Sequence, residues 1–326
     1  MSFANANISD IMATTIESRT RKIADNVTNN NAILKRMSTK GRIKNFSGGY
    51  KILQELSFAE NSNAGWYSGY DLLPVGVSDV ISAAEFNIKQ AAVPVIISGL
   101  EQLQNAGREQ MIDLMESRLS VAESTIANLI TGGLYSDGTG AGGKAIDGLQ
   151  AALPIDPTAA PYGGIDGATF TFWQNQVKDS ANTTTLQADW NELWANLVRG
   201  QDRPDLIMVD SLAWQAYVAS LQAQQRFSNT NMADAGFNSI KFMDADVVLD
   251  GGIYNGSLGS GAPATTAFFL NTDYLHYRPH SARNMVPLSP NRRYATNQDA
   301  EVQIIAWAGN LTCSGRMFQG RWDGAA

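Results

Sequence analysis

Residues 48–90 constrain the fold most, because they contain two alternating runs separated by a polar tip. The outgoing run, residues 50–58, and the return run, residues 78–89, place apolar side chains at every second position, as β-strands do. The apolar face of the outgoing run consists of Tyr50, Ile52, Leu56 and Phe58. A two-stranded ribbon alone in water is marginally stable, so this face needs a partner surface.

The tip between the two runs carries Trp66, Tyr67 and Tyr70 among Asn, Ser and Gly residues. Large aromatic side chains at a loop tip are typical of contacts between molecules. The partner surface is therefore either a second copy of the chain or the rest of the same domain, and the pattern alone leaves both open.

Charge is distributed unevenly along the 326 residues. The formal net charge is -7, but residues 1–49 carry eight Lys or Arg against three Asp or Glu, a net of +5. Such asymmetry is typical of a basic arm that contacts a polyanion and is joined to an acidic body. A helix with a solvated basic face is the alternative.

The single cysteine, Cys313, excludes an intrachain disulfide and favours a reducing compartment. The first residues lack the charged start and apolar segment of a signal peptide. No stretch approaches the roughly 18 apolar residues of a membrane span. We therefore expect no membrane association.

Apolar periodicity predicts the remaining elements. Residues 103–131 form the clearest helix, roughly 40 Å long and ended by Gly132 and Gly133, which suggests a spine. Residues 7–37 predict two short helices with a break at Asn29–Asn31, and residues 91–97 predict a buried strand in which Pro94 requires an edge or a bulge. Further helices are expected at 189–198 and 212–221, and strands at 204–209, 246–249, 267–270, 274–277 and 301–313.

The sequence contains no motif that predicts a catalytic or metal site. His276 and His280 lie in strand-like sequence around Pro279, which does not give the helical face that two metal ligands at this spacing need. Residues 138–143 match a dinucleotide fingerprint literally, but they follow a long helix instead of a strand, so we interpret the match as chance. Asp244, Asp246 and Asp250 lack the spacing of a calcium loop, and Cys313 lacks an evident histidine partner. We expect a protein that binds, with no enzymatic activity and no cofactor.

The order of these elements resembles the major capsid proteins of tailed bacteriophages, of the HK-ninety-seven fold type. The resemblance covers essentially the whole chain and includes residues 47–50 and 66–71, 220–222 and 225–227, 297–300 and 309–312. It implies an α+β fold with an N-terminal arm (1–47), an extended β-hairpin arm that starts the peripheral domain (48–90), a peripheral domain with the spine helix (91–137), an axial α/β domain (138–264) and C-terminal strands of the peripheral domain (265–326).

The resemblance also implies a function. Copies would form pentamers and hexamers in an icosahedral head shell, and each hairpin arm would bury the Tyr50, Ile52, Leu56 and Phe58 face against a neighbour. The basic arm, with Arg19, Arg21, Lys22, Lys35 and Arg36, would face inward, where packaged double-stranded DNA would be contacted without sequence preference. The shell protein of a bacterial encapsulating nanocompartment is the alternative.

Other partners implied are a portal, a separate scaffold protein and a possible decoration protein, with assembly in the bacterial host cytoplasm and a final location in the virion. Lys51 lies near the base of the arm and not at its tip. We therefore expect no covalent crosslink between subunits.

Overall fold

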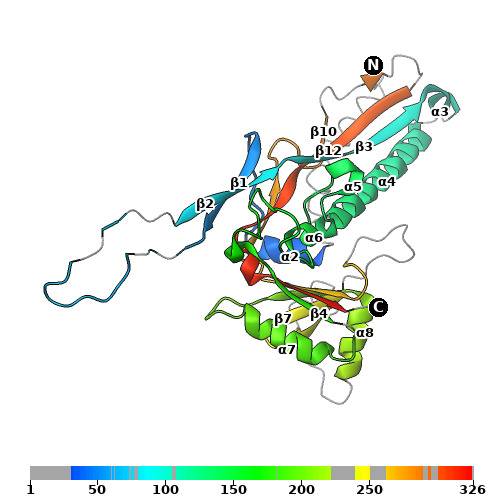
Figure 1. Cartoon of the computed structure of the whole chain (residues 1–326). Coiled ribbons are helices and arrows are strands. Elements are labelled where there is room, and N and C mark those ends of the chain that lie inside the picture. Colours follow the sequence, from blue (N-terminus) through cyan, green and yellow to red (C-terminus); the bar gives the residue numbers. More distant parts are fainter. Residues whose placement is uncertain are drawn as a thin grey trace.

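A computed structural model describes residues 31–59, 61, 63–72, 75–76, 80–104, 108–180, 182–221, 239–249, 262–288, 293–294 and 300–324. Its parts are a hairpin arm that projects from the body, an elongated unit around a long helix, and a unit built on a six-stranded sheet (Figure 1). The helices are α2 (Ala32–Thr39), α3 (Gly99–Gln104), α4 (Arg108–Tyr135), α5 (Gly140–Gly143), α6 (Leu149–Ala152), α7 (Leu186–Leu197) and α8 (Ser211–Ser220), with 3₁₀ turns η1 (Thr171–Trp173) and η2 (Arg316–Phe318).

Two strands, β1 (Lys51–Ser57) and β2 (Ile81–Asn87), pair antiparallel and form the hairpin arm. The elongated unit is organised around the 14-residue strand β12 (Ala300–Cys313). On one side β12 pairs with β3 (Lys89–Ser98) over its first ten residues. On the other side it pairs with β9 (Leu275–Pro279), β10 (Val286–Pro287) and β11 (Arg293–Tyr294). Because β12 is the only partner of β3 among the described strands, Pro94 lies in an edge strand, as predicted. The prediction that residues 91–97 are buried is wrong, because only Val95 and Ile97 of this run are buried.

Helix α4 runs along this sheet as the predicted spine and spans 28 residues, about 42 Å at 1.5 Å per residue (Figure 1). Leu119, Ala122 and Ile126 are buried, as the periodicity predicted. The prediction that Gly132 and Gly133 end the helix is wrong, because α4 continues to Tyr135. A Cβ on Gly133 would lie 2.8 Å from Ile146 Cδ1, so this glycine lets the next loop pack closely on the helix.

The six-stranded sheet has the order β4-β13-β8-β5-β7-β6. Its strands are β4 (Gln176–Ser180), β5 (Leu206–Val209), β6 (Ser239–Phe242), β7 (Ala245–Leu249), β8 (Thr266–Leu270) and β13 (Gly320–Gly324). Strands β8 and β13 come from residues 265–326, which the sequence assigned to the peripheral domain. They pair instead with β4 and β5, because β13 inserts between β4 and β8. The sheet is therefore complete only when the C-terminal strand β13 pairs with β4 and β8. The local sequence pattern does not predict this pairing.

Both faces of this sheet are covered, which explains the continuous apolar run of β5. Leu206 and Met208 belong to a core shared with α4 and the hairpin base, whereas Ile207 and Val209 belong to a second core under α7 and α8. Trp190 of α7 lies at the centre of the second core. Its ring centroid lies 4.9 to 6.3 Å from those of four other aromatic residues, Tyr217, Phe242, Phe269 and Trp322.

Helix α2 begins where the sequence predicted a break. The side chain of Asn31 accepts hydrogen bonds from the backbone N–H groups of Ile33 and Leu34, at 3.0 and 3.1 Å, and so caps the helix. Ile33, Leu34 and Met37 are fully buried. The predicted helix before this break lies outside the described residues.

Two leucines of α4 provide a matched test of the core. Leu134 is fully buried and Leu129 is half exposed. We expect Leu134→Ala to lower the free energy of unfolding by about 2 to 5 kcal/mol, because it leaves a cavity, and Leu129→Ala to lower it by less than about 1 kcal/mol. Urea unfolding of the monomeric fraction measures both. Equal losses would contradict the assignment of the buried face.

Candidate assembly interface

The base of the hairpin arm packs on its own chain. Ile52 and Leu56 of β1, and Ala84 and Phe86 of β2, are at most 3% exposed. Phe86 makes an edge contact with Tyr162, with ring centroids 5.1 Å apart. Ile52 and Leu56 were expected to be buried by a neighbouring subunit, and this expectation is wrong. Their face is covered within the chain, because the loop of residues 162–173 folds over it.

Two contacts fix that loop. The backbone N–H of Glu85 donates to the carbonyl of Gly163 at 2.8 Å. Gly163 has a φ of +61°, and a Cβ there would lie 2.9 Å from both Ala84 Cβ and Phe86 Cζ. A glycine is therefore required by conformation and by space.

The two ends of the predicted apolar face differ from its middle. Phe58 is half-buried and stacks on Phe172 of the same chain, with ring centroids 5.2 Å apart. Tyr50 is 93% exposed and is not part of the buried face. The sequence placed all four side chains on one face, but only the loop residues, 110 positions downstream, decide which of them are covered.

The tip of the arm remains bare. Trp66 and Tyr70 are fully exposed and Tyr67 is 68% exposed. Leu72 and Val75, which were not among the predicted interface residues, are also almost fully exposed. These five side chains form what we call the tip cluster. In Figure 1 the tip lies far from both units of the body.

Short polar contacts shape the tip. The backbone N–H of Ser68 donates to the Asp71 carboxylate at 2.8 Å, and the N–H of Asp71 donates to the Ser68 carbonyl at 2.9 Å. Gly69 supplies a φ of +41° at this turn. Across the loop, the Asn63 amide donates to the carbonyl of Gly76. The Asn, Ser and Gly residues thus form turns, and the aromatic side chains point into solvent.

A second exposed apolar surface lies along the spine. Ile96 of β3 and Val121 of α4 are 48% and 66% exposed, and both line a cavity of about 400 Å³ between these two elements. The same cavity is lined by Pro94 and Arg118. This groove is an apolar site on the body of the molecule, in addition to the tip cluster.

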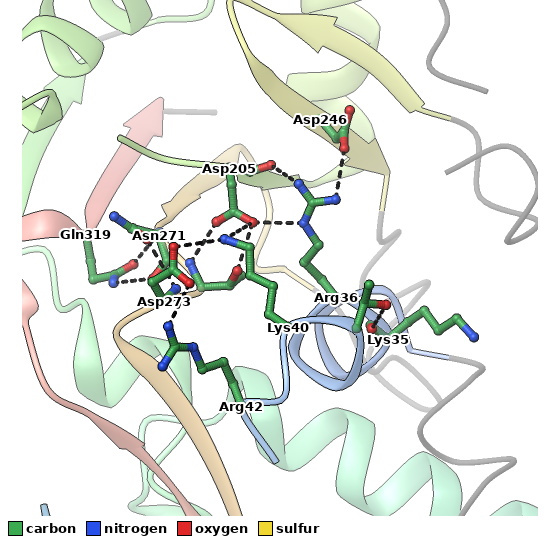
Figure 2. A network of polar contacts seen from close by, with 11 residues as sticks. Lys35, Arg36, Lys40, Arg42, Asp205, Asp246, Asn271, Asp273 and Gln319 are labelled. Carbon is green, nitrogen blue, oxygen red and sulfur yellow. Dashed lines mark hydrogen bonds and ion pairs between the residues drawn. The ribbon is translucent and has the colours of Figure 1, made fainter. Parts of the chain in front are cut away.

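The basic segment that contains α2 is held by the chain itself (Figure 2). Arg36 Nε lies 2.8 Å from the Asp205 carboxylate, and Arg36 Nη1 lies 3.5 Å from that of Asp246. Asp246 is buried, and the Arg36 side chain is 25% exposed. Arg36 is therefore engaged in a part-buried ion pair with the six-stranded sheet of its own chain, and its inward orientation stays a prediction.

Neighbouring cations extend this network. Lys40 lies 3.3 Å from Asp205 and 3.0 Å from Asp273, and Arg42 lies 2.9 Å from Asp273. Burial alone would raise the pKa of the Asp273 carboxyl, but hydrogen bonds from Arg42 and Lys40 outweigh it and hold that pKa below its usual value. Lys35, on the same helix, is half-buried and also takes part in a polar interaction. Arg19, Arg21 and Lys22 lie outside the described residues.

No group of three or more potential metal-ligating side chains occurs in the described part of the chain. His276 is buried in β9. Its pKa is lowered to about 4, mainly by burial and further by the charges of Lys44, Arg42 and Arg278. Cys313 is buried in β12, where burial raises the pKa of its thiol to about 12. Such a thiol is no nucleophile at neutral pH.

The glycine-rich run 138–143 directly follows helix α4 instead of a strand, so the fingerprint is a chance match, as predicted. Asp244 pairs with Arg203 at 2.6 Å, and both side chains are more than half exposed. Asp250 lies outside the described residues. Within the described helices, none combines the length and apolarity that crossing a bilayer would require.

The fold of this chain is similar to that of several solved structures. No protein-family model and no curated protein sequence matches the chain. Among solved structures, the capsid asymmetric unit of cyanophage A-1(L) is similar with a TM-score of 0.66 and 14% identity, over 88% of this chain and 91% of that one. The capsid of a native GTA particle has a TM-score of 0.56 and 10% identity, over 89% and 90%. The procapsid of satellite phage P4 has a TM-score of 0.51 and 12% identity, over 93% and 90%.

These likenesses extend over nearly the full length of each chain. They show that the chain has the α+β fold of phage major capsid proteins, as the resemblance implied.

Two arginines that pair with aspartates test the network around α2. We expect Arg36→Ala to lower the free energy of unfolding by about 3 kcal/mol, because it removes a charge that compensates the buried Asp246. Arg203→Ala, which removes an exposed pair, should change it by less than about 1 kcal/mol. Denaturant unfolding of the monomeric fraction compares the two. Similar small losses would show that α2 is held by its apolar face alone.

The lowered pKa of His276 predicts that the free energy of unfolding depends on pH. Its pKa in the folded protein, about 4, lies below the ordinary histidine value of 6.5, so the unfolded chain binds the proton more readily. Stability is therefore fully present above pH 6.5 and falls as pH decreases toward 4, at no more than about 1.4 kcal/mol per pH unit. His276→Gln should flatten this part of the curve when unfolding is measured at several pH values. An unchanged slope would exclude His276 as its source.

Proposed function

We propose that this chain is the major capsid protein of a tailed phage, which self-assembles into the icosahedral shell that encloses the double-stranded DNA genome. One observation carries the proposal. The hairpin arm is fixed at its base by its own chain but presents a cluster of aromatic and aliphatic side chains at its far end. On a phage capsid fold, such a tip is suited to binding a neighbouring copy.

The main partner is therefore the chain itself. Pentamers and hexamers would gather around the six-stranded unit, and the arm of each subunit would reach a neighbour. The tip cluster, with Trp66, Tyr67 and Tyr70, would supply the buried aromatic contacts. Aromatic side chains commonly dominate the energetics of protein interfaces.

Packaged DNA is the second proposed partner. Since Arg36 is bound to aspartates of its own chain, contact with DNA would be made by Arg19, Arg21 and Lys22, with Lys35 as a further candidate. Contact of this kind neutralises phosphates without reading bases, so it would weaken steeply as salt increases.

The remaining proposals follow from the shell role. The protein would be located in the virion after assembly in the host cytoplasm, and its contacts would include a portal, a separate scaffold and a possible decoration protein. The solved P4 procapsid contains a size determination protein, and a phage G capsid contains a decoration protein. We propose a structural role with no enzymatic turnover.

Two tryptophans separate assembly from folding. Trp66 is fully exposed at the tip, and Trp173 is 1% exposed under the hairpin base. We expect Trp66→Ala to abolish or strongly reduce particles in electron micrographs while far-ultraviolet circular dichroism and the free energy of unfolding stay unchanged. Trp173→Ala should lower the free energy of unfolding by about 3 to 5 kcal/mol.

The purified wild-type particles also test the contents of the shell. Icosahedral particles from the wild type, with none from Trp66→Ala, would support the proposal. A wild type that remains monomeric at every concentration would contradict it. Particles produced in infected cells that contain enzymes and no DNA would instead support an encapsulating compartment.

A further inference from the structure

Three side chains with complementary chemistry meet where the hairpin arm joins the body. Lys89 is the first residue of β3, Asn310 lies near the end of β12, and Asp147 lies in the loop between α5 and α6. Lys89 pairs in register with Gly309, the neighbour of Asn310. A primary amine, a carboxylate and a carboxamide are thus brought together from three distant parts of the chain.

The carboxylate bridges the other two groups. Lys89 Nζ lies 3.3 Å from Asp147 Oδ1, and Asn310 Nδ2 donates to Asp147 Oδ2 at 2.7 Å. The amine and the amide nitrogen are therefore bound to the two oxygens of one carboxylate. A carboxylate in this position can accept a proton from the amine and donate it to the amide nitrogen.

The carbonyl oxygen of the carboxamide is held by two backbone donors. Asn310 Oδ1 accepts hydrogen bonds from the N–H of Asp147 at 3.0 Å and from the N–H of Leu311 at 2.9 Å. Two fixed N–H groups on one carbonyl oxygen are the arrangement that stabilises negative charge on that oxygen when a nucleophile adds to the carbonyl carbon.

Burial favours the amine over water as that nucleophile. The Asn310 residue is fully buried, and the side chains of Lys89 and Asp147 are only 10% and 24% exposed. Lys89 Nζ also donates to the carbonyl of Gly143 at 2.7 Å. To reach Asn310 the amine must leave this carbonyl, which the flexible four-carbon lysine stem allows.

The backbone makes room for the carboxylate. Gly138 has a φ of +82°, and a Cβ there would lie 2.6 Å from Asp147 Oδ1. A glycine of the run that resembled a nucleotide fingerprint thus leaves space for Asp147. The carboxylate position depends on this glycine as well as on its partners.

We propose that Lys89 and Asn310 form an isopeptide bond within the subunit, with Asp147 as the proton carrier. Asp147 takes a proton from the Lys89 ammonium, and the neutral amine attacks Asn310 Cγ. The tetrahedral oxyanion is bound by the two backbone N–H groups. Asp147 returns the proton to Nδ2, the Cγ–Nδ2 bond breaks, and ammonia is released. The Asp147 carboxylate then takes the second proton from the former lysine nitrogen, which becomes the neutral amide N–H, and passes it to the ammonia, which departs as ammonium. The new amide joins β3 to β12, and no oxidant, reductant or other reactant is needed.

This bond lies inside one chain, so it is separate from a crosslink between subunits and independent of the proposed shell. It would form in a reaction that each molecule undergoes once. Its position, at the junction of the arm and the sheet, would tie the two strands covalently at the point from which the arm extends (Figure 1).

Mass spectrometry of the denatured full-length protein tests the proposal. We expect the wild type, after prolonged incubation at neutral pH, to be about 17 Da lighter than its unreacted form, the mass of one ammonia. A protease digest should contain a branched peptide that joins residues 89 and 310. Lys89→Arg keeps a cation beside Asp147 and Asp147→Asn keeps the shape of that side chain, so both should fold and show no ammonia loss.

Two results would overturn the inference. One is a wild-type protein with its unreacted mass and no branched peptide, whatever the variants show. The other is a gain of about 1 Da at Asn310, which would mean that water hydrolyses the amide instead of the lysine attacking it. Because the mass and the protease digest of the wild type together decide between these outcomes, a variant that fails to fold leaves the test intact.

Discussion

Closure of the hairpin base by residues 162–173 is the constraint on which the shape of the molecule depends. A free two-stranded ribbon has little stability of its own. Here its apolar face is covered by Tyr162 and Trp173, which stack at 6.2 Å. Beneath them, the buried guanidinium of Arg316 lies 5.2 Å from the Tyr162 ring and donates to the carbonyl of Ala152 at 2.8 Å. The arm therefore extends from a packed base, whereas its tip makes no comparable contact among the described residues.

Charged side chains of the N-terminal segment also make contacts within the chain. The charge pattern predicted that the basic segment after residue 30 is part of an arm that contacts a polyanion. In the structure, Arg36, Lys40 and Arg42 are paired with aspartates of the body. These pairs join residues more than 160 positions apart. They fix where the N-terminal segment leaves the body, and any role with DNA is left to residues that precede them. Part of the positive charge of residues 1–49 thus holds this segment on the body, which the composition alone does not show.

Local periodicity was enough to predict most elements. Helices α4, α7 and α8 and strands β5, β7, β8 and β12 all lie where apolar spacing placed them, within a few residues. What failed depends on distant contacts. Gly133 was predicted to stop a helix, but it lies inside α4 because Ile146 packs against it. The family resemblance assigned Ile52 and Leu56 to a neighbour, whereas the pattern left their partner open because it cannot show the loop that covers them. The apolar face was predicted correctly for Ile52 and Leu56, but not for Tyr50, and its covering partner was not predicted.

The distinction between base and tip has an energetic meaning. A buried Trp or Tyr removes about 150 to 250 Å² from water, which at about 25 cal/mol per Å² corresponds to roughly 4 to 6 kcal/mol before the entropy of association is subtracted. At the base, this energy stabilises the subunit before any assembly. At the tip, the same residue types, Trp66 and Tyr70, remain fully exposed, so their burial energy is available only between molecules. A chain that folds first and associates later needs this separation, because an aromatic tip that folded back onto its own body would leave nothing to hold a neighbour.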